Sequence, residues 1–172
     1  MHATEHSGRL RVLPDCWIRI GAEMVLLDNL PDLSDSKGAS YNDESVIGRA
    51  APIKTYTNSD NRSISCSINL FIQSPGDAEK NLRTLRVIQS AVYPRTGNPY
   101  YPPPVCQIKC GKLLSNTPLC CVLKDYSVKY PTDVPWDEAT MCPYRLEISM
   151  TFEAVYAGAN LPNSESILED SP

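Results

Sequence analysis

The side chains in this chain best suited to catalysis or metal binding are two histidines, seven cysteines and twenty acidic residues. His2 and His6 both lie in the first six residues, so histidine-dependent catalysis would need this terminal segment to fold back into a pocket. Asp125 and Asp133 could form a carboxylate pair of the glycosidase type, but both stand in turn contexts where aspartate is commonly structural. The sequence has no glycine-rich phosphate loop and no nucleophile elbow. We therefore expect no catalytic residues, no cofactor and no enzymatic activity.

The cysteines suggest two alternatives, a zinc site or packing in the core. Four thiolates can complete a tetrahedral zinc site, but adjacent cysteines point to opposite faces of a strand. Free cysteine is also among the most buried residue types. We expect core packing without metal, and a zinc-stabilised binding module remains the alternative. The cysteines concerned are Cys106, Cys110, Cys120, Cys121 and Cys142.

Length and composition limit the class of protein. A chain of 172 residues with 42% hydrophobic residues can form one domain with a sizeable core. The net charge of −4 leaves no basic footprint for tight nucleic-acid binding. No apolar run approaches the roughly 20 residues that cross a bilayer. The odd cysteine count and the lack of an apolar signal-peptide core in residues 1–10 favour folding in a reducing cytoplasm.

Two stretches, Arg62–Ile72 and Tyr144–Tyr156, alternate strictly between apolar and polar residues. This period of two predicts long antiparallel strands with one buried face and one polar face. The polar faces supply our candidate functional residues. They are Ser63, Ser65, Ser67, Asn69, Glu147, Ser149 and Glu153.

The remaining pattern predicts one helix and several shorter strands. Ser74-Pro75-Gly76-Asp77 predicts a helix start, with Ser74 as cap, Pro75 in the first position and Asp77 completing a capping box. An apolar stripe follows to Val92, and the helix is expected to end before Tyr93-Pro94. We expect proline-rich loops at 94–104 and 130–136, and a bulge near Lys124-Asp125. Further strands are expected at 10–13, 17–20, 24–27, 105–114 and 119–130.

The expected organisation is a single domain over residues 1–156 followed by a flexible tail over 157–172. Residues 28–45 are polar and read as an extended loop or arm, with no core position before Val46-Ile47. The predicted fold class is α+β, mainly antiparallel β, with one flanking helix and extended arms. Such a domain leaves sheet edges that subunit pairing in a closed ring can protect.

Taken in order, the motifs of residues 40–156 resemble those of baseplate proteins of contractile-tailed bacteriophages, in particular the tail-tube-like proteins that initiate the tube. The motifs are Tyr41-Asn-Asp-Glu-Ser-Val-Ile-Gly-Arg49, Pro52-Ile-Lys-Thr-Tyr56, Arg62-Ser-Ile-Ser65, the capped helix ending at Tyr93-Pro94, Pro102-Pro-Pro-Val105, Gly111, Tyr126 and Cys142-Pro-Tyr-Arg-Leu-Glu-Ile148.

The resemblance implies a tail-tube-like β-sandwich or barrel and a structural role in the virion. Six subunits would form a ring whose strands build an inner barrel, with the helix outside. The ring would join the central hub and spike to the tail tube, and DNA would only pass through the channel. The candidate residues would then face the lumen, where a slightly acidic wall repels phosphates; a sheet face exposed to ordinary solvent is the alternative and predicts the same polarity. A monomeric hub or adaptor component of the same baseplate is the alternative. Assembly would take place in the bacterial host cytoplasm, without a membrane.

Overall fold

The computed structural model of the chain describes residues 15–97, 100–158 and 161–169. Every strand pair in these ranges is antiparallel, which confirms the expected class, mainly antiparallel β with helices. The elements are β1 (Cys16–Ile20), β2 (Glu23–Leu26), β3 (Asp32–Ser36), β4 (Ala39–Glu44), β5 (Ile53–Ser59), β6 (Ser63–Phe71), α1 (Asp77–Ser90), β7 (Cys106–Cys110), β8 (Leu119–Lys129), β9 (Arg145–Ala154) and α2 (Ser164–Glu169).

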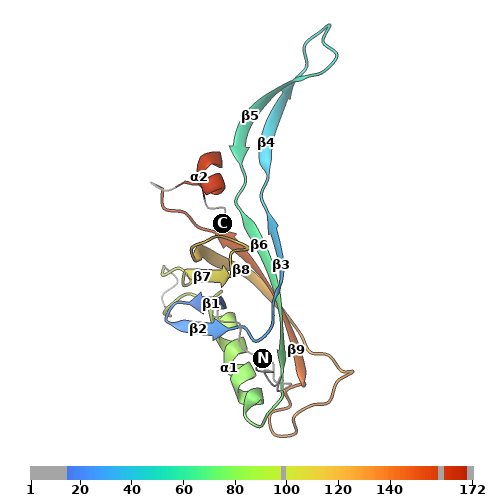
Figure 1. Cartoon of the computed structure of the whole chain (residues 1–172), viewed down its shortest axis with the longest axis vertical. Coiled ribbons are helices and arrows are strands. Elements are labelled where there is room, and N and C mark those ends of the chain that lie inside the picture. The colour runs from blue at the N-terminus through green and yellow to red at the C-terminus, as the bar shows by residue number, and fades with distance from the viewer. Residues whose placement is uncertain (1–14, 98–99, 159–160, 170–172) are drawn as a thin grey trace, which may run out of the picture.

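Seven strands form one sheet in the order β2-β1-β7-β8-β9-β6-β3, and β4 and β5 form a separate two-stranded sheet. The larger sheet is strongly bent, because β1, β2 and β7 run across the direction of the long strands β6 and β9 (Figure 1). Side chains from both ends of the sheet meet in one buried cluster, which includes Ile18, Ile68 and Ile148. Leu85 and Ile88 of α1 belong to the same cluster. The core thus lies between the inner face of the bent sheet and the helix.

The two long strands predicted from alternation are β6 and β9, which pair with each other along their length. Their apolar residues face the core: Cys66 opposes Met150, and Ile64 opposes Phe152, the largest fully buried side chain. Leu70, near the end of β6, is only partly buried. Both predicted strands are confirmed, because a strand with one buried face must place its apolar residues at every second position.

The strands expected at 17–20, 24–27 and 119–130 match β1, β2 and β8 to within one residue at each end, whereas β7 covers only Cys106–Cys110 of the strand expected over 105–114. Gly21 has a φ of 59° in the turn that joins β1 to β2, a conformation that glycine adopts without steric cost. The register between β8 and β9 shifts between Leu123 and Asp125, which confirms the predicted bulge. The described residues of the loop 94–104 contain no helix or strand. The strand expected at 10–13 lies outside the described residues.

The helix start differs from the prediction. Helix α1 begins at Asp77, two residues after the expected Pro75, and Gly76 takes the N-cap position with a φ of 93° and no side-chain cap. The Asp77 carboxylate accepts hydrogen bonds from the backbone N–H groups of Ser74 (2.8 Å) and Gln73 (3.0 Å). One of the two hydrogen bonds of the predicted capping box is therefore present, that from the Ser74 backbone N–H to the Asp77 carboxylate. The Ser74 side chain does not cap the helix. These bonds, that from Gln73 first, hold the pKa of Asp77 below its usual value.

The inward face of α1 matches the predicted stripe in part. Ala78, Leu85 and Ile88 are buried, and the helix ends at Ser90, as expected before Tyr93-Pro94. The buried Asn81 was not anticipated; its side chain donates a hydrogen bond to the carbonyl oxygen of Phe71 (3.1 Å). This bond fastens the helix to the end of β6 and satisfies a polar group that burial would otherwise destabilise.

Residues 28–45, expected to form an extended loop or arm, contain the strands β3 and β4, and β5 follows at Ile53–Ser59. β3 joins the edge of the large sheet beside β6, and β4 and β5 form a hairpin that projects well beyond the rest of the molecule (Figure 1). Val46 and Ile47, the first expected core positions, lie instead in the connection between β4 and β5 and are 47% and 104% exposed. Their placement in a core was wrong, because the hairpin carries them away from the sheet.

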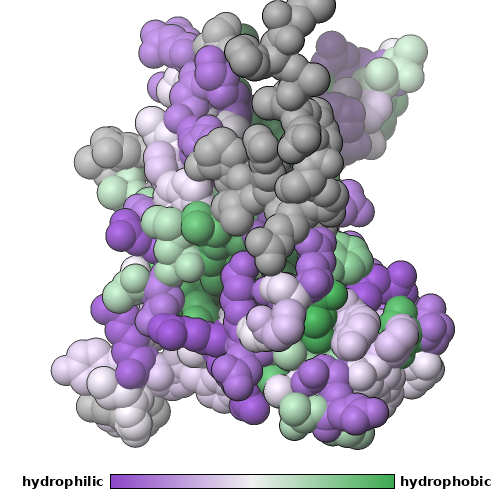
Figure 2. Space-filling view, turned by 60° about the horizontal axis from the view of Figure 1, so that its bottom comes forward, coloured by the Kyte–Doolittle hydropathy of each residue, from purple (hydrophilic) through white to green (hydrophobic). Residues whose placement is uncertain are grey.

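Part of the segment expected to be a flexible tail forms the short helix α2. Asn163 caps it, since its side-chain oxygen accepts a hydrogen bond from the backbone N–H of Ser166 (2.8 Å). The end of the molecule opposite the β4–β5 hairpin carries the start of α1 and the loop between β8 and β9 (Figure 1). Figure 2 shows that end as mostly hydrophilic, with hydrophobic side chains visible in separate groups.

Candidate functional site

The seven polar candidate residues lie together on the outer face of β6 and β9, opposite the buried core. Six of them are partly buried between neighbouring strands and Ser65 is exposed. The hydroxyl groups of Ser67 and Ser149 are hydrogen-bonded across the two strands at 2.9 Å. The cross-strand pairs on this face are Ser63 with Glu153, Ser65 with Thr151, Ser67 with Ser149, Asn69 with Glu147 and Phe71 with Arg145.

Strand β8 extends the polar face and supplies charges that partner its glutamates. Lys124 forms an ion pair with Glu153 at 2.7 Å, and Lys129 lies 3.9 Å from Glu147. The hydrogen bond from Lys124 to Glu153 raises the pKa of that lysine. These lysines were not among the candidates. The bulge shifts the alternation of β8 within the strand, so the period of two does not reveal which residues share the face.

The face spans four strands, β3, β6, β9 and β8, and its charge is close to balanced. Because paired residues share a face, the register adds Asp32 opposite Ser67 and Asp125 opposite Thr151. Acidic side chains then outnumber basic ones by four to three, a slight acidic excess. The charged residues counted are Asp32, Asp125, Glu147 and Glu153 against Lys124, Lys129 and Arg145.

The second prominent feature is the projecting hairpin formed by β4, β5 and their connection, residues 39–59, which we call the arm. Nearly all of its residues are exposed on both faces. Tyr41 and Tyr56 oppose each other and their rings pack edge to face at 5.8 Å, and Lys54 pairs with Asp43 at 2.8 Å. A two-stranded hairpin with so little burial is marginally stable in water.

The arm carries exposed apolar side chains at its far end. Val46, Ile47 and Ile53 are 47%, 104% and 38% exposed. Exposed aliphatic groups gathered on a projecting segment are typical of a surface that another molecule covers. The arm is therefore a candidate docking element.

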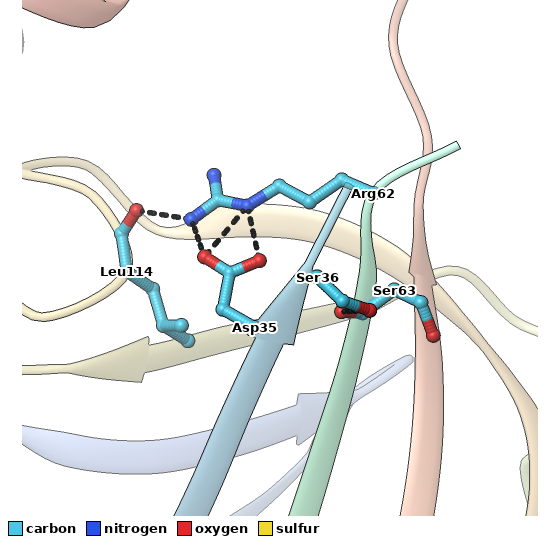
Figure 3. A network of polar contacts seen from close by, with 5 residues as sticks. All are labelled: Asp35, Ser36, Arg62, Ser63 and Leu114. Atoms are coloured by element: carbon cyan, nitrogen blue, oxygen red, sulfur yellow. Dashed lines mark hydrogen bonds and ion pairs between the residues drawn. The ribbon is translucent and has the colours of Figure 1, made fainter. Parts of the chain in front are cut away.

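A polar network holds the base of the arm (Figure 3). The guanidinium of Arg62, at the start of β6, donates two hydrogen bonds through Nε and one through Nη2 to the carboxylate of Asp35 on β3. Nη2 also donates to the carbonyl oxygen of Leu114 at 2.8 Å. The pKa of Arg62 is raised, and the largest cause is its hydrogen bonding to Asp35. This cluster ties the edge strand to β6 and to the loop between β7 and β8, at the point where the sheet gives way to the arm.

Backbone contacts continue the hairpin across the same junction. The N–H of Asp60, which lies between β5 and β6, donates to the carbonyl oxygen of Gly38, which lies between β3 and β4, at 2.9 Å. A Cβ atom at Gly38 would lie 2.5 Å from the Asp60 carboxylate, so a larger residue would displace that side chain. The arm is thus an extension of the β3–β6 pair and is not a detached loop.

The cysteines lie where the core hypothesis placed them. Cys106, Cys110 and Cys121 are buried, and Cys120 is exposed on the other side of its strand. Burial raises the pKa of these three thiols. Across residues 15–97, 100–158 and 161–169, no group of three or more histidine, cysteine or acidic side chains is arranged to hold a metal ion.

The proposed carboxylate pair is not brought together. Asp125 accepts a hydrogen bond from Thr151 at 2.8 Å, whereas the exposed Asp133 lies 3.8 Å from Arg145, at the other end of β9. Thr151 and Arg145 are six residues apart on an extended strand, a backbone separation of about 20 Å. The two carboxylates therefore contact different parts of the sheet. His2 and His6 lie outside the described residues.

No protein-family model and no curated protein matches the chain. Neither of the helices in the described ranges has the length and apolar composition needed to cross a lipid bilayer.

Proposed function

We propose that this chain is a structural subunit of a contractile phage baseplate, which assembles into a ring of six that joins the central hub and spike to the tail tube and initiates the tube. The proposal rests on the resemblance of residues 40–156 to tail-tube-like proteins and on one structural observation, the arm. No enzymatic activity is part of this role, and the particle tail is where the protein would function.

The arm supports an assembly role because its exposure is difficult to explain in an isolated subunit. Its strands bury little on either face, and its far end presents Val46, Ile47 and Ile53 to solvent. Contact with a neighbouring subunit would cover these groups and stabilise a hairpin that is marginal alone. A projecting element that extends the β3–β6 pair also gives one subunit the reach to contact another.

The polar sheet face supports a channel wall. Its row of serine, threonine and asparagine side chains suits contact with water, and its slight acidic excess disfavours the binding of DNA phosphates. In the proposed ring, the outer face of β3, β6, β9 and β8 lines the lumen and α1 lies outside. The bent seven-stranded sheet then forms one segment of a tail-tube-like sandwich or barrel, completed by the other subunits.

Electron microscopy of the chain co-expressed with the hub and tube proteins of the same particle tests this role. We expect class averages with a sixfold annulus and an open channel. Light scattering of the chain alone and with the hub protein measures its oligomeric state in parallel. A chain that stays monomeric under both conditions overturns the ring and favours the adaptor alternative.

A matched pair of variants tests the contribution of the arm. Ile47→Asp places a charge at the end of the arm, whereas Leu30→Asp makes the same change at a residue that is 66% exposed and lies between β2 and β3. Both variants should keep the circular dichroism spectrum of the parent. We expect Ile47→Asp to abolish the annulus and Leu30→Asp to retain it. Equal assembly of the two variants contradicts a docking role for the arm.

A further inference from the structure

Two buried cysteines face each other across the neighbouring strands β1 and β7, at the point where β1 begins and β7 ends. Cys16, the first residue of β1, lies opposite Cys110, the last residue of β7. Their sulfur atoms are 3.1 Å apart, and the residues are 3% and 2% exposed. Both are free thiols. The sulfur atoms already lie in contact, so closing a bond between them needs only a small movement.

The backbone at this point also suits a disulfide. The Gly111 N–H donates to the carbonyl oxygen of Asp15 at 2.8 Å, which makes the adjacent Cys16–Cys110 pair a non-hydrogen-bonded pair of the antiparallel ladder. The Cα atoms of such pairs are about 4.5 Å apart. Disulfides span Cα separations of about 4.4 to 6.8 Å. The strands therefore need not move apart to accommodate the bond.

A second cysteine pair provides an internal control. Cys106 and Cys121 are also buried register partners, on β7 and β8. Their thiols are directed to backbone oxygens, since Cys106 Sγ donates to the carbonyl of Pro104 and Cys121 Sγ donates to the carbonyl of Cys106, each at 3.7 Å. Burial and strand pairing are thus shared by both pairs, and the contact between sulfur atoms distinguishes the first.

We infer that Cys16 and Cys110 form an oxidation site, which hydrogen peroxide converts to a cross-strand disulfide. The thiolate of one cysteine attacks the peroxide, so that an S–O bond forms, the O–O bond breaks and hydroxide leaves to become water. The sulfur of the second cysteine then attacks the sulfenic acid, an S–S bond forms, and the second oxygen leaves as water. Two thiols lose two electrons and two protons, and one peroxide is reduced to two waters.

The position of the pair gives the oxidant access without global unfolding. Cys16 begins a strand and Cys110 ends one, so fraying of this end of the sheet can expose both sulfur atoms. Burial raises the pKa of both thiols, which slows the reaction in the closed state. The chain would therefore stay reduced in a reducing cytoplasm and become oxidised slowly outside it.

The bond should stabilise the fold measurably. It joins residues 94 positions apart, and loops of that length lose enough unfolded-state entropy to raise the Tm by an amount on the order of 10 °C. Dithiothreitol should reverse the rise. This effect belongs to the isolated chain and does not depend on ring assembly.

Peptide mapping of the oxidised full chain tests the inference. The exposed Cys120 is first replaced by serine, and the folded, reduced protein is treated with hydrogen peroxide, the peroxide is removed, and the chain is unfolded in urea with N-ethylmaleimide to block every remaining thiol before digestion with trypsin. The four relevant cysteines fall in separate peptides, 12–19, 96–109, 110–112 and 113–124. We expect a linked pair of peptides 12–19 and 110–112, with peptides 96–109 and 113–124 alkylated.

The outcomes are distinct. The expected linkage, together with a Tm rise that Cys110→Ala loses and Cys106→Ala keeps, supports the inference. Absence of this linkage in folded protein overturns it, as does linkage of Cys106 to Cys121 in equal yield or linkage that appears only in urea. Mapping of the Cys120→Ser chain, whose substitution is at an exposed residue, decides the matter even if Cys110→Ala or Cys106→Ala prevents folding.

Discussion

Replacing Arg62 by alanine tests whether the polar network at the base of the arm is a structural clamp. Arg62 is the shared donor to Asp35 and to the backbone carbonyl of Leu114. The Arg62 side chain is 14% exposed, whereas that of Asp35 is 37% exposed. The alanine variant leaves the carbonyl of the buried Leu114 without this donor, while the Asp35 carboxylate can be rehydrated.

The structure sets the expected magnitude. A hydrogen bond to a charged group contributes about 1.5–3 kcal/mol, and an ion pair near the surface about 1 kcal/mol or less. We expect Arg62→Ala to lower the free energy of unfolding by about 2–3 kcal/mol and the Tm by about 5–10 °C. Asp35→Ala should cost about 1 kcal/mol, because Arg62 keeps its bond to Leu114.

Urea unfolding of the two single variants and the double variant measures these values and the coupling between them. Hydrogen exchange at the Asp60 amide, which bonds to Gly38, reports on the junction; we expect its protection to fall in Arg62→Ala. Lys54→Ala is the control, since its pair with Asp43 lies exposed on the arm. If Arg62→Ala costs no more than Lys54→Ala, the clamp does not exist.

Three further predictions concern the helix start, the core and the polar face. Hydrogen bonds from backbone N–H groups, of which that from Gln73 is the strongest cause, lower the pKa of Asp77 in the folded chain. The ionised Asp77 carboxylate therefore stabilises the fold at pH values above its unfolded pKa of about 4, and this stabilisation is lost as the pH falls through the pKa of the folded chain. Asp77→Asn should therefore be less stable than the parent by about 1 kcal/mol at pH 7, and thermal melts should show that gap closing as the pH falls below about 4. Phe152→Ala removes a side chain that is fully buried and should cost about 3–5 kcal/mol in urea unfolding; a loss below 1 kcal/mol would contradict its place in the core. Ser67→Ala should cost about 0.5–1 kcal/mol, while adding Ser149→Ala should cost little more, because no partner is then left unsatisfied; additive losses in a double-mutant cycle would refute the pairing.

Local pattern was sufficient to predict the main strands and the candidate face. Alternation with a period of two identified β6 and β9, because each strand must bury one face whatever its partners are. The same rule placed all seven candidate residues on one side of the sheet. The shift from Leu123 to Tyr126 in the apolar pattern of β8 predicted the bulge for the same reason.

The paired strands of the arm could not be predicted in this way, although residues 28–45 were expected to form an extended loop or arm. Its residues bury neither face, so no alternation marks its strands, and Val46 and Ile47 resembled core positions although they lie exposed. The lysines that partner the glutamates of the polar face were also missed, because the bulge displaces them. In both places the structure is determined by pairing between strands, and the local sequence pattern does not show which strands pair.

The amino-acid sequence by itself determined the long strands β6 and β9, which of their faces is buried and the position of helix α1, since these depend on neighbours a few residues away. Only the tertiary structure decided which distant residues meet. Arg62 contacts Asp35 27 positions away, and Cys16 contacts Cys110 94 positions away. Such contacts depend on strand order and on the bend of the sheet, and both arise from packing the whole core at once.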